Sequence, residues 1–246
     1  MKVIIVNDYE ELSVEAYKIV KGVMLNNDKT KIGFATGGTP VGLYKKLIKG
    51  YRKGDISFKN VTTFNLDEYV GLDKEDKQSY YHFMKYNLFD YIDINFDNVN
   101  FLNGVNKDIN AECERYNNLL NESEIDIQIL GVGSNGHIAF NEPGTSFESE
   151  THIVNLSDST IEDNSRFFES VNEVPRKALT MGINNIMKAK RLLILVNGMS
   201  KKDAVFSLFN EKISTELPIS IIKKHKDATL ICDKLSFSKL IRYFEE

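Results

Sequence analysis

Short apolar runs alternate with amphipathic stretches along the chain, and this alternation constrains the fold more than any other feature. The runs are rich in β-branched residues and mostly lack polar alternation, as is typical of strands buried on both faces. They lie at 3–6, 31–35, 61–64, 125–131, 191–196 and 228–232. Apolar residues between Leu12 and Met24 recur at helical spacing, and a second predicted helix follows Pro40.

Strands that alternate with helices indicate a parallel sheet covered by helices on both faces. The sequence therefore predicts an α/β fold: a Rossmann-like, three-layer αβα arrangement with a mostly parallel central sheet. In such folds, ligands bind at the carboxyl ends of the strands. Side chains that follow the apolar runs are consequently the first candidates for a functional site.

The length of the chain and its lack of linkers favour a single domain that spans residues 1–246. A chain of 246 residues could form two domains, but it contains no repeat, no low-complexity tract and no flexible linker, and it has only 4 prolines. The least regular segment, at about 156–174, is polar and rich in Asn, Ser, Asp and Glu. We interpret this segment as a helical lid over the site.

Charge and cysteine content restrict the partners and the compartment. A net charge of −4 gives no broad attraction for nucleic acid or for an anionic membrane surface. Cys113 and Cys232 are too few for a disulfide framework or a thiolate metal cage, which fits a reducing cytoplasm. The first apolar run is too short for a signal or membrane-spanning segment. We expect a cytoplasmic protein with a small-molecule partner; the sequence leaves a monomer and a homo-oligomer equally open.

A glycine-rich turn, GFATGGTP at 33–40, leads from a predicted strand into a predicted helix. Glycines let backbone N–H groups approach an anion, and the helix start adds positive potential. Thr36 and Thr39 add hydroxyl groups to Gly37 and Gly38. The turn matches neither the P-loop nor the dinucleotide-binding pattern, so it predicts phosphate binding without indicating a nucleotide. A simple tight turn explains this segment alone equally well.

Two adjacent carboxylates, Asp67 and Glu68, follow the run at 61–64 and should emerge at the ligand-binding edge of the sheet. One of them could face a ligand. Taken alone, the pair is better explained by Asp67 capping the next segment, because Asp is common at such positions.

The segment 129–144 is a buried run that ends in a glycine-dense loop with one histidine, His137, followed five residues later by Glu142. Imidazole suits proton transfer near neutral pH, and a nearby carboxylate can orient the ring and stabilise its charged form. The loop lacks the spacing of a metal site, so we expect acid–base chemistry and no metal.

Two cations, Arg166 and Lys201, could clamp a phosphate, although each alone is more typical of a solvated surface residue. An aromatic stripe at 80–84 is more typical of core packing, and we assign it no functional role.

Five segments taken together resemble the glucosamine-6-phosphate deaminase family. They are TGGTP at 36–40, NLDEY at 65–69, SYY at 79–81, GHIAFNEP at 136–143 and NSRFF at 164–168. The matches keep their order from about 33 to 233, and the GHIAFNEP segment is highly specific for this family within its superfamily. The resemblance implies conversion of glucosamine 6-phosphate and water into fructose 6-phosphate and ammonia, without a cofactor.

The resemblance also implies roles for individual residues. Asp67 would be the base that removes the C2 proton and returns it at C1, and His137 would assist ring opening with Glu142 as its partner. The phosphate would be held by Gly37, Gly38, Thr39, Arg166 and Lys201, with Arg166 on a mobile lid.

The sequence departs from the family pattern at two places. Many members carry aspartate where this chain has Asn135, beside the catalytic histidine; an uncharged amide would stabilise an imidazolium less, which predicts an altered pH profile. Allosterically activated members carry two basic residues where this chain has His152 and Val154. The chain thus resembles the shorter, unregulated type, and a hexamer is not implied.

Three alternatives remain open at this point. Two are related enzymes: a galactosamine-6-phosphate deaminase and a 6-phosphogluconolactonase-like hydrolase. The third, a sugar-phosphate sensor domain, is less favoured because such proteins usually carry an N-terminal helix-turn-helix, whereas here the first predicted strand starts near residue 2.

Overall fold

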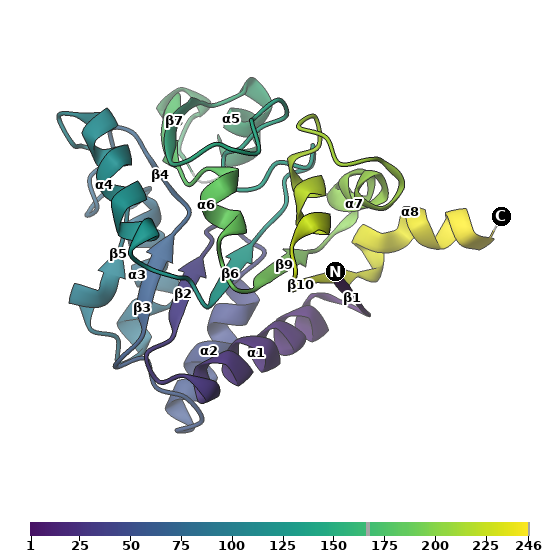
Figure 1. Cartoon of the computed structure of the whole chain (residues 1–246), viewed down its shortest axis with the longest axis horizontal. Helices are drawn as coiled ribbons and strands as arrows, with labels where there is room; N and C mark the ends of the chain where they lie inside the picture. Colours follow the sequence, from purple (N-terminus) through teal and green to yellow (C-terminus); the bar gives the residue numbers. More distant parts are fainter. Residues whose placement is uncertain (166–167, 246) are drawn as a thin grey trace.

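The computed structural model describes residues 1–165 and 168–245, and its centre is a seven-stranded parallel sheet (Figure 1). All neighbouring strands run parallel. In spatial order they are β1 (Lys2–Val6), β10 (Ala228–Asp233), β9 (Leu192–Val196), β6 (Ile127–Leu130), β2 (Lys31–Phe34), β3 (Thr62–Asn65) and β5 (Val99–Asn100). The six apolar runs all form strands of this sheet, which confirms the predicted α/β fold.

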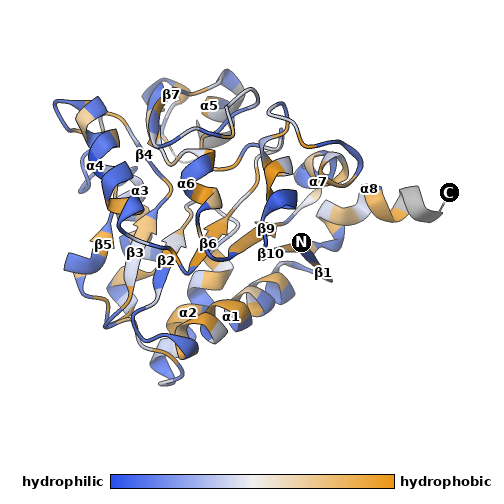
Figure 2. Ribbon diagram, in the orientation of Figure 1, coloured by the Kyte–Doolittle hydropathy of each residue, from blue (hydrophilic) through white to orange (hydrophobic). Residues whose placement is uncertain are grey.

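Helices cover both faces of the sheet. One face packs against α1 (Tyr9–Asn26), α2 (Val41–Arg52) and α3 (Tyr80–Asn87), and the other against α4 (Ile109–Asn121), α6 (Ile183–Met187), α7 (Lys202–Asn210) and α8 (Lys234–Glu245). Neighbouring strand residues point to opposite faces, so Ile129 belongs to the first hydrophobic core and Leu130 to the second. Figure 2 shows apolar residues concentrated on the central strands and on α1 and α2.

Short 3₁₀ turns complete the connections between these elements. They are η1 (Phe89–Tyr91), η2 (Phe96–Asn98), η3 (Val171–Glu173), η4 (Met199–Lys201) and η5 (Pro218–Lys224). In the part of the chain that the structure describes, no helix is both long enough and apolar enough to cross a membrane.

A second, three-stranded antiparallel sheet was not predicted. It consists of β4 (Asp67–Tyr69), β8 (Lys177–Thr180) and β7 (His152–Asn155), and Asp67 pairs with Thr180. A single residue, Leu66, separates β4 from β3 of the large sheet. Asp67 therefore lies at the junction of the two sheets.

The segment 156–174 contains a short helix, α5 (Asp158–Ser165), and the turn η3. Helical structure was expected here, and it lies beside the small sheet (Figure 1). The function of this segment as a lid stays a prediction.

Candidate active site

A cavity of about 870 Å³ opens at the carboxyl ends of β2, β3, β6 and β9. The structure brings seven of the residues singled out in the sequence to its wall: Thr36, Gly37, Gly38, Thr39, Asp67, His137 and Lys201. Asn135 and Glu142 lie behind the wall and surround His137. Arg166 falls outside the described residues.

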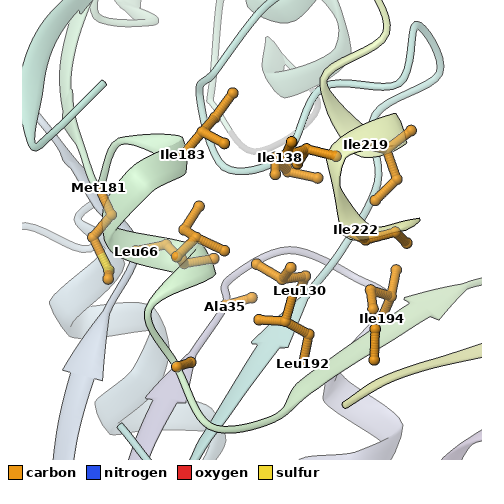
Figure 3. Packing of buried hydrophobic residues seen from close by; sticks show 14 of the residues in the cluster. Ala35, Leu66, Leu130, Ile138, Met181, Ile183, Leu192, Ile194, Ile219 and Ile222 are labelled. Atoms are coloured by element: carbon orange, nitrogen blue, oxygen red, sulfur yellow. The ribbon is translucent and has the colours of Figure 1, made fainter. Parts of the chain in front are cut away.

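The two catalytic candidates are anchored by their neighbours in the sequence. Leu66 precedes Asp67, Ile138 follows His137, and both apolar side chains are buried in the same hydrophobic core (Figure 3). The backbone N–H of Ile219 also donates to the carbonyl of Gly136 at 2.9 Å. Because this core is closely packed, it fixes the spacing between the Asp67 and His137 segments.

The glycine-rich turn is held from two directions. The Tyr9 hydroxyl, at the start of α1, donates to the Gly38 carbonyl at 2.9 Å and accepts from the Gly42 N–H at 2.7 Å. The Thr39 hydroxyl donates to Asn197 Oδ1 at 2.8 Å, beyond the end of β9. Sequence reasoning missed Tyr9, since nothing in an amphipathic helix indicates that its first residue reaches a loop about thirty positions away.

The Asp67 carboxyl is buried, with 6% of the residue exposed, and it lines the cavity. Burial and the neighbouring Glu68 carboxyl raise the pKa of Asp67 to about 8. Among the groups that the structure describes, none donates a hydrogen bond to this carboxyl, and only burial and Glu68 act on its pKa. Asp67 therefore caps no helix, and its oxygens remain available to a ligand.

Unlike Asp67, Glu68 does not line the cavity. Its carboxylate accepts the backbone N–H groups of Tyr69 at 2.9 Å, Tyr80 at 2.9 Å and Tyr81 at 3.0 Å. Burial raises the pKa of Glu68 to about 7, against the opposing effect of these three donors. The start of α3 is thus held by Glu68 and by its N-cap residue Ser79, whose hydroxyl accepts the His82 N–H at 3.0 Å, and not by Asp67.

The buried Asp67 carboxyl makes the stability of the protein depend on pH. Its pKa is higher in the folded protein than in the unfolded chain, so the folded state binds more protons between about pH 4 and pH 8. The free energy of unfolding contributed by this group therefore falls as pH rises through that window. We expect Asp67→Asn to raise the melting temperature more at pH 9 than at pH 5, as measured by thermal unfolding. An equal change at both pH values would contradict this assignment.

His137, Glu142 and Asn135 form a compact group. His137 Nδ1 lies 3.6 Å from Glu142 Oε2, and the two side chains are 20% and 16% exposed. Asn135 Nδ2 donates to Glu142 Oε2 at 2.8 Å, and Asn135 Oδ1 accepts the backbone N–H of His137 at 3.1 Å. Burial alone would raise the pKa of Glu142, but the His137 ring and hydrogen bonds from Thr160 and Asn135 lower it to about 2.

Glycine is required where the loop passes the imidazole ring. A Cβ atom on Gly133 would lie 2.4 Å from His137 Nδ1 and 2.3 Å from Cε1, closer than atoms can pack. Glycine at this position therefore makes room for the ring. The glycine density of this loop, which the sequence could only relate to a site in general, has a specific steric cause here.

Aromatic residues form part of the cavity wall, contrary to the core role expected for the stripe at 80–84. Tyr80 and Phe140 line the cavity with their rings stacked at 6.1 Å between centroids, and the Tyr80 hydroxyl donates to the Tyr69 hydroxyl at 3.2 Å. Met84, in contrast, is fully buried in the core as expected. Helical spacing alone cannot distinguish a side chain that lines the cavity from one that is buried in the core.

Comparisons with known proteins find close relatives over nearly the whole chain. Residues 9–231 match the family model of glucosamine-6-phosphate isomerases and 6-phosphogluconolactonases. The glucosamine-6-phosphate deaminase of Clostridium novyi is 51% identical over 241 residues, which cover 98% of this chain and 100% of the relative. That of Clostridium acetobutylicum is 49% identical with the same coverage of both chains.

A solved structure of a monomeric glucosamine-6-phosphate deaminase superposes with a TM-score of 0.95 at 44% identity, covering 97% of this chain and 99% of the other. The resemblance inferred from short motifs thus extends over almost the whole chain. The chain belongs to the family of glucosamine-6-phosphate isomerases and 6-phosphogluconolactonases and, within it, to the glucosamine-6-phosphate deaminases.

Proposed function

We propose that this protein converts glucosamine 6-phosphate and water into fructose 6-phosphate and ammonia. The observation that carries the proposal is the position of Asp67, a buried carboxyl without a hydrogen-bond donor among the described residues, in one cavity with His137 and the glycine-rich turn. Identities of 44–51% to deaminases over nearly the whole chain support the same reaction.

The phosphate of the substrate binds at the glycine-rich turn in this proposal. Residues 36–39 precede α2, and the positive end of that helix and the backbone N–H groups of the turn favour an anion. Lys201 lines the same cavity and adds a positive charge, and Arg166 would add a second one.

Asp67 acts on the carbon chain. A substrate ammonium group beside the carboxylate favours its ionised form, which offsets the effect of burial on the pKa of Asp67. The carboxylate takes the C2 proton of the open-chain aldehyde and produces an enolamine. The protonated Asp67 then returns this proton at C1, and water attacks the resulting C2 iminium carbon, which releases ammonia and leaves the C2 ketone.

His137 assists ring opening by moving a proton from the anomeric hydroxyl to the ring oxygen. Ionised Glu142 faces Nδ1 and favours the tautomer with its hydrogen on that nitrogen. Nε2 is then the nitrogen that exchanges a proton with the sugar.

The proposal is tested by incubating purified, EDTA-treated protein with glucosamine 6-phosphate and measuring ammonia and fructose 6-phosphate. Formation of both products is expected, and formation of neither overturns the proposal. Parallel incubations with galactosamine 6-phosphate and 6-phosphogluconolactone test the two related activities. A lactonase breaks no C–H bond, so it has no use for Asp67 as a base.

We expect Tyr9→Phe to raise KM for glucosamine 6-phosphate about fivefold with little change in kcat. The phenol makes two hydrogen bonds that hold the glycine-rich turn, and a neutral hydrogen bond contributes about 1 kcal/mol. Steady-state kinetics provide the measurement. Tyr17→Phe is the matched control, because the Tyr17 hydroxyl lies on the same helix but donates to Asp55; equal KM values for the two variants would refute the role of Tyr9.

A further inference from the structure

Two hydroxyl groups from the segment 156–174 contact Glu142 at Oε1, whereas His137 faces Oε2. The Thr160 hydroxyl donates to Glu142 Oε1. The Ser157 hydroxyl lies 3.3 Å from the same oxygen and 3.0 Å from Thr160 Oγ1. Thr160 is 4% exposed and lines the cavity. Neither hydroxyl was identified from the sequence.

The two oxygens of Glu142 therefore contact different parts of the molecule. Oε2 faces His137 and Asn135 in the loop after β6, whereas Oε1 faces the first turn of α5. The Ser157 hydroxyl also accepts the backbone N–H of Thr160 at 3.2 Å, so the residue that precedes and caps this helix contacts Glu142 as well. The Glu142 carboxylate thus connects α5 to the loop after β6.

Such an arrangement controls both the charge and the orientation of Glu142. Hydrogen bonds to an ionised acceptor are about twice as strong as neutral ones. The Ser157 hydroxyl can donate to Thr160, whose own proton then goes to Glu142, and hydrogen bonds in such a chain strengthen one another. The positive end of α5 also favours a negative charge at this place.

We propose that Thr160 is a positioning residue for ring opening: its hydroxyl holds Glu142 ionised and turned toward His137. The His137–Glu142 pair is then complete only while the first turn of α5 is docked on the loop after β6. This inference rests on the deaminase function proposed above and adds to it a residue that acts through Glu142 without touching the reacting atoms.

A double-mutant cycle tests whether Thr160 acts through Glu142. Thr160→Val keeps the shape of the side chain and removes the donor, and we expect kcat to fall about tenfold, the usual scale for one hydrogen bond to a charged group. Thr160→Ser keeps the hydroxyl and should retain most of the activity. In a Glu142→Gln background, Thr160→Val should lower kcat by less than about twofold.

Two further measurements separate this role from a general effect on folding or on binding. The reduced open-chain analogue, 2-amino-2-deoxyglucitol 6-phosphate, has no ring to open, so its affinity should be the same for Thr160→Val and the wild type. Circular dichroism establishes that each variant folds. If Thr160→Val does not fold, Ser157→Ala takes its place in the cycle, with a smaller expected loss of kcat and the same dependence on Glu142.

An equal loss of kcat in both backgrounds would overturn the inference, because Thr160 would then support the segment without acting through Glu142. A weakened affinity for the open-chain analogue would overturn it too. The same double-mutant cycle can be measured on melting temperatures, which requires no enzymatic activity. Additive changes in melting temperature would refute the coupling between Thr160 and Glu142 without affecting the deaminase proposal. The deaminase proposal itself fails if the wild type releases no ammonia.

Discussion

We expect Asp67→Asn to lower the turnover of glucosamine 6-phosphate at least about a hundredfold, the usual scale for the loss of a general base. The amide has nearly the same shape as the carboxyl but cannot accept the C2 proton. Asp67 accepts no hydrogen bond from the groups that the structure describes, so the substitution breaks no such contact. The substrate should therefore still bind.

Steady-state kinetics and binding of the open-chain analogue measure the two effects separately. Asp73→Asn is a suitable control, because Asp73 is an exposed carboxylate on the loop that follows β4. Its kcat should equal that of the wild type. Wild-type turnover by Asp67→Asn would remove this residue from the role of base.

His137→Gln should lower kcat about a hundredfold with the cyclic substrate, since a positioned acid–base group contributes at least this factor. Glutamine fills part of the space of the ring but cannot exchange protons near neutral pH. The open-chain form that arises in solution should still lose its C2 proton to Asp67, so a slow residual turnover is expected. Fructose 6-phosphate is followed over time after substrate is mixed with the variant. This measures both the lowered turnover of the cyclic substrate and the residual turnover of the open-chain form.

His152→Gln serves as the control for His137→Gln, because His152 lies on β7 and contacts the backbone carbonyl of Glu150. It should behave as the wild type. An unchanged kcat in His137→Gln would show that the ring opens without help from the imidazole.

The large sheet could be predicted because its longer strands are short apolar runs, and β6, β9 and β10 are buried at every residue. Such runs carry their signal locally, as at 192–196, where every residue is buried. The small sheet had no local signal. Its strands have three or four residues, and Asp67 pairs with Thr180 across more than a hundred positions, which no periodic pattern can show.

The same difference between local sequence signals and contacts of distant residues explains which site residues could be predicted from the sequence. Asp67, His137 and the glycine-rich turn all lie within seven positions after the end of a strand of the large sheet, where parallel sheets bind their ligands. Tyr9 and Thr160 contact site residues that are 29 and 18 positions away in the sequence. Their types and spacing are ordinary for helices, so only the folded structure identifies them.

Asn135 has a different meaning in the structure from the one that the sequence suggested. From the sequence, we expected only that an asparagine in place of aspartate would stabilise the charged ring of His137 less. The amide, however, donates to Glu142 and accepts from the backbone of His137, and a carboxylate could not do both. Asn135 therefore connects the two residues to which we assign ring opening.

The role of Asp67 in breaking the C2–H bond is tested most directly by proton NMR in D₂O. Glucosamine 6-phosphate is incubated with the wild type and with Asp67→Asn at equal concentrations, and the C2–H signal is followed. With the wild type, this signal should disappear as fructose 6-phosphate forms. With Asp67→Asn, it should persist at least about a hundredfold longer. Loss of the C2–H signal at the same rate in both samples would contradict the assignment of Asp67 as the base.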